Sequence, residues 1–130
     1  MTSVPGSSKS FVGGIVAYDN AVKVAQLGVD PALIEREGAV SEAVAIEMAC
    51  GVRRLLVADV AISVTGIAGP DGGTPEKPVG LVWIALDASD GSQAYRLQLR
   101  GDRNSIQSRA TTAGLGIIWK RCRGEERSPA

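Results

Sequence analysis

The sequence has 130 residues, of which 45% are apolar, and this suits one domain built around a single hydrophobic core. Acidic and basic residues balance at 14 each, so the charge does not favour binding to nucleic acid or to anionic lipid. No apolar run approaches the roughly 18 residues of a membrane-spanning helix, and the first residues lack the pattern of a secretory signal peptide. A cytoplasmic location is therefore expected.

Histidine is absent from the sequence, and the two cysteines, Cys50 and Cys122, lie far apart. Ser-His-Asp and Cys-His catalytic groups therefore cannot be built from this chain alone. Histidine-rich zinc sites are excluded as well, so neither a metal nor another cofactor is predicted. Any general base must be a lysine, a carboxylate or a tyrosinate.

The first third of the chain predicts one strand and two short helices. The apolar run Phe11–Tyr18 predicts a strand, in which Gly13-Gly14 indicates a bulge or a close backbone approach. Asn20 is expected to cap a short helix that Gly28 ends. A second short helix is predicted over Pro31–Glu37, because proline is favoured at the first helical position.

The middle of the chain gives the clearest helix and a buried strand. Ser41 is predicted to be the N-cap of a helix over Glu42–Val57, whose apolar residues Val44 and Met48 begin a stripe along one face. Asp59–Thr65 is almost continuously apolar, as expected of a central strand that is buried on both faces.

The last third predicts a hairpin and a long helix. Val79–Leu86 and Ala94–Leu99 read as strands, and the short, turn-rich connection Asp87–Gly91 predicts that they pair antiparallel. Asp102 is expected to cap a final helix over Arg103–Arg121.

Helices precede and follow the predicted strands, so we expect helices on both faces of the sheet. The predicted fold is α/β, with three α/β/α layers and a central mixed sheet that includes the hairpin. One domain is expected over residues 1–122, and the polar stretch 123–130 is expected to be a disordered tail.

The glycine-rich segment Thr65–Gly80 is the main candidate for a site, because ligands of open α/β sheets gather where strands end. Its five glycines permit positive φ angles and let backbone N–H groups approach a ligand. It is neither a Walker A loop nor a dinucleotide-binding fingerprint, since it lacks Gly-Lys-Ser/Thr and a strand follows. An anion cradle or an oxyanion hole is predicted. The alternative is an ordered connection rich in turns, with Lys77 solvated.

Two blocks of this segment, Thr65–Pro70 and Gly72–Gly80, closely resemble the signature of the CinA C-terminal domain family. These are competence/damage-inducible proteins whose members include nicotinamide mononucleotide deamidases. The resemblance extends over about residues 2–120. Its other matching blocks are Val4–Ser8, Phe11–Tyr18, Leu27–Val29, Gly38–Glu42 and Gly101–Arg103.

The resemblance implies hydrolysis of the carboxamide of nicotinamide mononucleotide to nicotinic acid mononucleotide and ammonia, by a Ser/Lys amidohydrolase. Lys23 would be the general base, with Tyr18 beside it. Arg103 would bind the phosphate of the nucleotide, because a planar guanidinium and a helix N-terminus both favour that anion. The other implied substrate contacts are Thr65, Gly66, Ile67, Ala68, Gly69 and Gly73.

The sequence departs from the family pattern at its start. Family members carry a segment resembling Glu-Ser-Cys-Thr-Gly-Gly ahead of the Val4–Ser8 block, on a helix preceded by a strand, and its serine is the nucleophile. This chain begins just ahead of that block, so that strand, helix and serine are expected to be missing. Two functions remain open: an impaired nicotinamide mononucleotide amidohydrolase, or a non-catalytic domain that binds a nucleotide or a protein. The uncovered apolar surface predicts a homo-oligomer or a domain-swapped arrangement.

Overall fold

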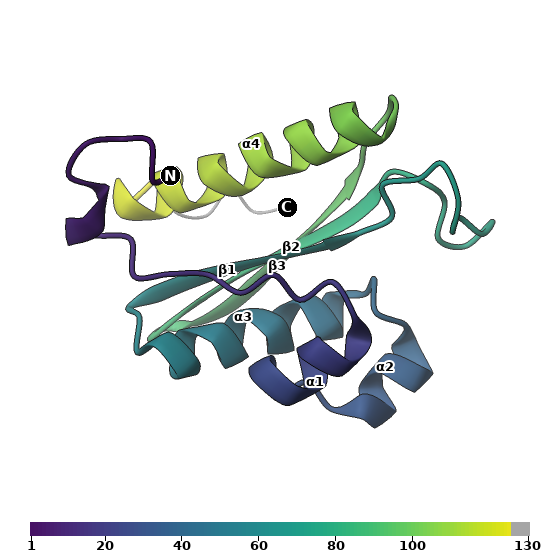
Figure 1. Ribbon diagram of the computed structural model, residues 1–130, viewed down its shortest axis with the longest axis horizontal. Helices are drawn as coiled ribbons and strands as arrows, with labels where there is room; N and C mark the ends of the chain where they lie inside the picture. Colours follow the sequence, from purple (N-terminus) through teal and green to yellow (C-terminus); the bar gives the residue numbers. More distant parts are fainter. Residues whose placement is uncertain (126–130) are drawn as a thin grey trace.

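The computed structural model describes residues 1–125 (Figure 1). In chain order its elements are the 3-10 helix η1 (Ser7–Lys9), α1 (Asn20–Leu27), α2 (Pro31–Glu37), α3 (Glu42–Leu56), β1 (Val60–Gly66), β2 (Leu81–Ala88), β3 (Gly91–Gln98) and α4 (Arg103–Cys122). Among these described helices, none has both the length and the apolar character needed to cross a bilayer. The predicted disordered tail falls mostly on residues 126–130, which lie outside the described residues.

Helices enclose the sheet on both faces, which confirms the predicted α/β class and its three layers (Figure 1). On one face, Ile106 of α4 packs in a cluster with Ile84 of β2. On the other, Ala45 and Ala49 of α3 pack against Ala85, and all three are fully buried. These small side chains let α3 lie close to the strands. The helices α1 and α2 pack in turn against α3.

The sheet differs from the prediction in two respects. Its strand order is β1-β2-β3 with both pairs antiparallel, so the described strands form an antiparallel sheet and not a mixed one. The predicted central strand Asp59–Thr65 is β1, which lies at the edge, while β2 is central and almost wholly buried. The apolar sequence of β1 fits burial on both faces, yet Val64 lines an open cavity and remains 43% exposed.

The predicted hairpin is confirmed as β2 and β3, with a tighter connection than expected. Asp87 and Ala88 belong to β2, and β3 already begins at Gly91, so the turn consists of residues 89–90. Gly91 adopts a φ of 126°, a conformation that side chains with a Cβ atom rarely take. The backbone therefore turns within a span where the composition alone indicated a longer loop.

The predicted strand Phe11–Tyr18 is not a paired strand in the structure. The segment is extended, and its residues alternate strictly between half-buried and exposed, as in a strand with one covered face. Ile15 and Ala17 pack against the cluster that α1, α2 and α3 form. No strand of the described chain pairs with the segment, so its backbone lacks the ladder that defines a sheet.

Side-chain caps start the four α-helices, largely as predicted. Ser41 accepts a hydrogen bond from Val44 N at the start of α3, and Asp102 accepts one from Ser105 N at the start of α4. The cap of α1 is Asp19 and not the predicted Asn20, which is already helical. Both residue types cap helices well, so the sequence alone does not separate these neighbours.

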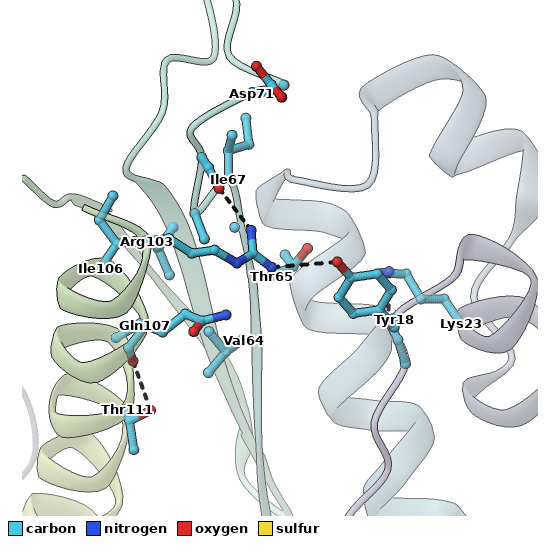
Figure 2. A pocket seen from close by; sticks show the side chains of 17 residues that line it. Tyr18, Lys23, Val64, Thr65, Ile67, Asp71, Arg103, Ile106, Gln107 and Thr111 are labelled. Atoms are coloured by element: carbon cyan, nitrogen blue, oxygen red, sulfur yellow. Dashed lines mark hydrogen bonds between the residues drawn. The ribbon is translucent and has the colours of Figure 1, made fainter. Parts of the chain in front are cut away.

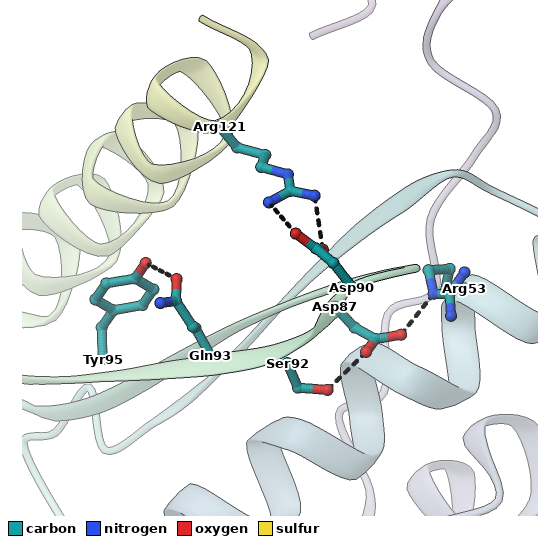
Figure 3. Close-up of polar contacts among 7 residues, drawn as sticks. All are labelled: Arg53, Asp87, Asp90, Ser92, Gln93, Tyr95 and Arg121. Carbon is teal, nitrogen blue, oxygen red and sulfur yellow. Dashed lines mark hydrogen bonds and ion pairs between the residues drawn. The ribbon is translucent and has the colours of Figure 1, made fainter. Parts of the chain in front are cut away.

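A polar network joins α3 to the hairpin (Figure 3). Arg53 Nε lies 2.6 Å from Asp87 Oδ2, and Ser92 Oγ donates to Asp87 Oδ1 at 2.6 Å. Burial by itself would raise the pKa of the Asp87 carboxyl, but hydrogen bonds from Ser92, Arg53 and Cys50 outweigh burial and hold that pKa below its usual value. The ionised carboxylate therefore stabilises the fold at neutral pH.

Asp87→Asn is expected to lower the free energy of unfolding at neutral pH by roughly 1–3 kcal/mol, because Arg53 loses its charged partner. A carboxyl with a lowered folded-state pKa stabilises the protein above the usual aspartate pKa of about 3.9, and this stabilisation is lost as pH falls through the lowered value. Urea denaturation at decreasing pH should therefore show the two proteins converging. Asp90→Asn is the control, since Asp90 pairs with Arg121 at the surface and should change stability by less than about 1 kcal/mol. A pH-independent gap would contradict the prediction.

Candidate functional site

A cavity of about 750 Å³ opens where β1 ends, and α4, the glycine-rich loop and residues 17–23 supply its other walls (Figure 2). The structure brings eight of the nine predicted site residues to this cavity. They are Tyr18, Lys23, Thr65, Gly66, Ile67, Ala68, Gly69 and Arg103. These residues span 85 positions of sequence, from Tyr18 to Arg103, so the fold and not local spacing gathers them.

Gly73 and Lys77 lie elsewhere in the loop. A Cβ atom at position 73 would come within 2.8 Å of Val79 N, so Gly73 allows the loop to pack on itself and does not line the cavity. The Lys77 ammonium, expected to be solvated, donates to the carbonyl oxygen of Glu37 at the end of α2. A cation is favourable there because the last helical carbonyls lack partners.

Lys23 is buried at the cavity wall, with 6% of its surface exposed. Its Nζ donates a hydrogen bond to Ala17 O at 2.9 Å, and no ion pair to it occurs among the described residues. Burial lowers the pKa of the Lys23 ammonium, although the nearby charge of Asp19 acts in the opposite direction. A larger fraction of Lys23 is therefore a neutral amine at a given pH than for a solvated lysine.

Tyr18 and Arg103 meet across the cavity (Figure 2). Arg103 Nη2 lies 3.5 Å from Tyr18 Oη, and Arg103 Nη1 donates to Gly69 O at 2.9 Å. The arginine thus links α4, the glycine-rich loop and the end of the extended segment 11–18. Tyr18 is 84% exposed, so its ring is accessible from solvent.

Contacts on two sides hold the end of β1 where it enters the loop. Thr65 Oγ1 donates to Ala39 O at 2.9 Å, which ties the strand to the residues before α3. Gly66 lies against β2, where a Cβ atom would come within 2.8 Å of Val82 Cγ2 and 3.0 Å of Leu81 O. This close approach explains the glycine without reference to a ligand.

Backbone N–H groups of the loop divide into two sets. Ile67 N donates to Leu81 O, and Gly80 N donates to Ile67 O, so these fix the base of the loop. In the described hydrogen bonds, neither Ala68 N nor Gly69 N is a donor. Both residues line the cavity, so these N–H groups are candidate donors to an anion or a developing oxyanion.

Gln107 and Thr111 also line the cavity, and neither was predicted from the sequence. They lie four and eight residues after Arg103, so the three share one face of α4. Thr111 Oγ1 donates to Gln107 O at 2.9 Å. The spacing from Arg103 was the signal that could have identified them.

The N-terminus of α4 is less open to an anion than expected. The Asp102 carboxylate accepts a hydrogen bond from Ser105 N, and this bond lowers the pKa of Asp102. A negative charge therefore already occupies the helix start. Attraction of a phosphate depends on the guanidinium of Arg103 more than on the helix terminus.

The residues that line the cavity thus carry a buried amine, a guanidinium and backbone N–H groups without a described acceptor. Comparisons with known proteins identify the family to which such a chain is similar. The CinA C-terminal domain matches residues 1–122. The chain belongs to this family. It is 56% identical over 121 residues to a putative competence-damage inducible protein of Halothermothrix orenii, covering 92% of this chain and 29% of that protein. It is 48% identical over 130 residues to a CinA-like protein of Mycobacterium tuberculosis, covering 99% and 30%.

Solved structures of the family share the fold. The competence/damage inducible protein CihA from Agrobacterium tumefaciens has a TM-score of 0.84 at 38% identity, over 90% of this chain and 73% of that one. A CinA superfamily protein from Escherichia coli has a TM-score of 0.87 at 31% identity, over 92% and 69%. The chain spans less than a third of the two curated relatives described above.

Proposed function

We propose that this cavity binds a nicotinamide mononucleotide-like nucleotide and forms the substrate-binding and general-base part of an amide-hydrolysing site. The observation that supports the proposal is Lys23, a buried amine at the cavity wall without an ion-pair partner in the described chain. Arg103 borders the same cavity and offers a fixed positive charge for a phosphate. The cavity thus offers a cation, Arg103, to the phosphate of a ligand and a base, Lys23, to its carboxamide end.

The reaction needs a hydroxyl nucleophile. Its oxygen attacks the carboxamide carbon while the neutral Lys23 amine accepts the hydroxyl proton. The C–N bond then breaks, and Lys23 returns that proton to the leaving group, which departs as ammonia. Water cleaves the resulting ester, releasing the carboxylic acid and restoring the hydroxyl. The N–H groups of Ala68 and Gly69 are candidates to stabilise the oxyanion formed at each attack.

The described chain does not place such a nucleophile at Lys23. The cavity is lined by the hydroxyls of Tyr18, Thr65 and Thr111, and no hydrogen bond joins the Lys23 amine to any of them. Thr65 and Thr111 instead donate to backbone carbonyls. This observation favours the second candidate function for the chain alone: binding of the nucleotide with little or no hydrolysis.

The test of the proposal is ligand binding with and without the phosphate. Calorimetry should show that nicotinamide mononucleotide binds more tightly than nicotinamide riboside, which lacks the phosphate. Arg103→Leu should weaken binding of the mononucleotide by about tenfold or more and leave binding of the riboside unchanged. The reason is that hydrogen bonds to charged groups contribute about 1.5–3 kcal/mol.

Arg109→Leu is the matched control, since Arg109 is exposed on α4 and does not line the cavity. It should bind the mononucleotide like the unmodified chain. If Arg103→Leu and Arg109→Leu bind it equally well, Arg103 does not hold the phosphate and the proposed orientation is wrong. If neither nicotinamide compound binds at all, the nucleotide proposal itself fails.

A further inference from the structure

The cavity contains a carboxylate to which the proposed reaction gives no role. Asp71 belongs to the glycine-rich loop and lines the same cavity as Arg103 and Lys23. Figure 2 shows Asp71 on the loop, on the opposite side of Arg103 from Gln107 and Thr111 of α4. The part of a ligand that this carboxylate would meet follows from its partners and its position.

Asp71 lacks the contacts that usually explain an aspartate in a turn. Such aspartates commonly accept a hydrogen bond from a backbone N–H two residues further on. Within residues 1–125, no hydrogen bond or ion pair engages the Asp71 carboxylate, and Arg103 bonds to Gly69 O and contacts Tyr18 instead. The cation and the carboxylate of this cavity are therefore not neutralised by each other, and a ligand can lie between them.

The loop anchors Asp71 near Arg103. Gly69 and Gly73, two residues before and two residues after it, both pack on Val79: a Cβ atom would lie 2.6 Å from Val79 Cγ1 at position 69 and 2.8 Å from Val79 N at position 73. Gly69 O also accepts the hydrogen bond from Arg103. Two residues of chain span at most about 7 Å, so Asp71 lies close to the point that the guanidinium holds.

The group that lies beside the phosphate in a nucleoside 5′-monophosphate is the ribose. Its 2′ and 3′ hydroxyls are neighbouring donors on one face of the sugar, and an ionised carboxylate has two acceptor oxygens and no donor. Acidic side chains bind the ribose 2′-hydroxyl in dinucleotide-binding sites in this way. With the phosphate on Arg103 and the carboxamide at Lys23, the ribose would lie between them, within reach of the loop that carries Asp71.

We propose that Asp71 and Arg103 form a ribose 5-phosphate subsite, in which the Asp71 carboxylate accepts hydrogen bonds from the two sugar hydroxyls. The subsite makes the cavity selective for ribonucleotides over deoxyribonucleotides. The role of Arg103 rests on the proposed function, whereas the role of Asp71 is additional to it. Because the subsite contacts only the sugar and the phosphate, it requires neither the nicotinamide ring nor hydrolysis.

The test compares ribose 5-phosphate with 2-deoxyribose 5-phosphate, which differ by one hydroxyl, in calorimetric titrations of the 130-residue chain. Ribose 5-phosphate should bind at least about tenfold more tightly, because the deoxy compound loses a hydrogen bond to a charged acceptor. Asp71→Ala should reduce the ratio of the two affinities to about one. This ratio is insensitive to a general loss of structure, which would weaken both ligands alike.

Glu76→Ala is the matched control. Glu76 is another exposed carboxylate of the same loop, and it does not line the cavity. This variant should keep the preference for ribose 5-phosphate. If Asp71→Ala keeps the preference as well, if Glu76→Ala removes it, or if the unmodified chain shows none, the ribose subsite is wrong.

Titration with nicotinamide mononucleotide separates this proposal from the proposed function. Binding of the mononucleotide that requires Arg103 but is unchanged in Asp71→Ala overturns the ribose subsite and leaves the proposed function in place. A preference for ribose 5-phosphate that requires Asp71, without binding of the mononucleotide, supports the subsite and contradicts the proposed function. If none of the three compounds binds, both proposals fail.

Discussion

Lys23→Met is expected to reduce ammonia release from nicotinamide mononucleotide, in the presence of a hydroxyl nucleophile, by about 10²- to 10⁴-fold, the usual contribution of a general base. Methionine fills nearly the same buried volume but has no amine, so it cannot accept the proton of the nucleophile. Binding of nicotinamide mononucleotide should persist, since Arg103 and the loop remain. The measurements are initial rates of ammonia release and the ligand dissociation constant of the same variant.

The pH dependence of the rate of ammonia release gives an independent test of the role of Lys23. Because only the neutral amine accepts a proton, the rate should rise with pH through the lowered pKa of Lys23, below the value of about 10.4 for a solvated lysine. The charge of Asp19 raises that pKa, so Asp19→Asn should lower it further and move the rise to lower pH. Asparagine can still cap α1, so the helix should remain. If the rate rises over the same pH range in Asp19→Asn as in the unmodified protein, Lys23 is not the general base.

Local signals in the sequence were sufficient for the helices. Pro31, Ser41 and Asp102 mark starts of α2, α3 and α4 through geometry that depends on only a few neighbouring residues. Gly28 ends α1 with a φ of 68°, again a local requirement. The hairpin of β2 and β3 was predicted for the same reason, because a short connection fixes how its two strands meet.

Strand pairing was harder to predict from the sequence, because a strand depends on partners that are distant in sequence. The segment 11–18 has the composition and the alternating burial of a strand, but nothing in the described chain pairs with it. β1 has the apolar character of a central strand and lies at an edge. The two segments end at the same cavity, which Tyr18 and Thr65 both line.

The candidate site was only partly open to prediction. Spacing places Arg103, Gln107 and Thr111 on one face of α4, whatever the rest of the chain does. The burial of Lys23 depends on Ala17 O and on the packing of α1 against α3, which no local pattern reveals. Without the family resemblance, Lys23 would have been read as a surface lysine. The tertiary contact between α1 and α3 therefore holds Lys23 at the cavity wall as well as stabilising the fold.

Gly51→Ala tests this contact and is expected to destabilise the protein by more than about 4 kcal/mol. Gly51 lies inside α3, and a Cβ atom there would lie 1.9 Å from Leu27 O and 2.7 Å from Leu27 C. These are backbone atoms at the end of α1, so no side-chain rotation relieves the overlap. The helix α1 must move away from α3, which also displaces Lys23 from the cavity wall. Urea denaturation should report the loss, and nicotinamide mononucleotide binding should weaken with it.

Gly116→Ala is the control for helix propensity. Gly116 lies inside α4, and a Cβ atom there would meet nothing within 4 Å. Alanine is a better helix former than glycine by about 1 kcal/mol, so this substitution should leave stability unchanged or raise it. The same chemical change thus has opposite expected signs at two helical positions, and only the approach of α1 distinguishes them. If both variants were equally stable, α1 would not lie against Gly51, and the burial of Lys23 that follows from this packing would have to be abandoned.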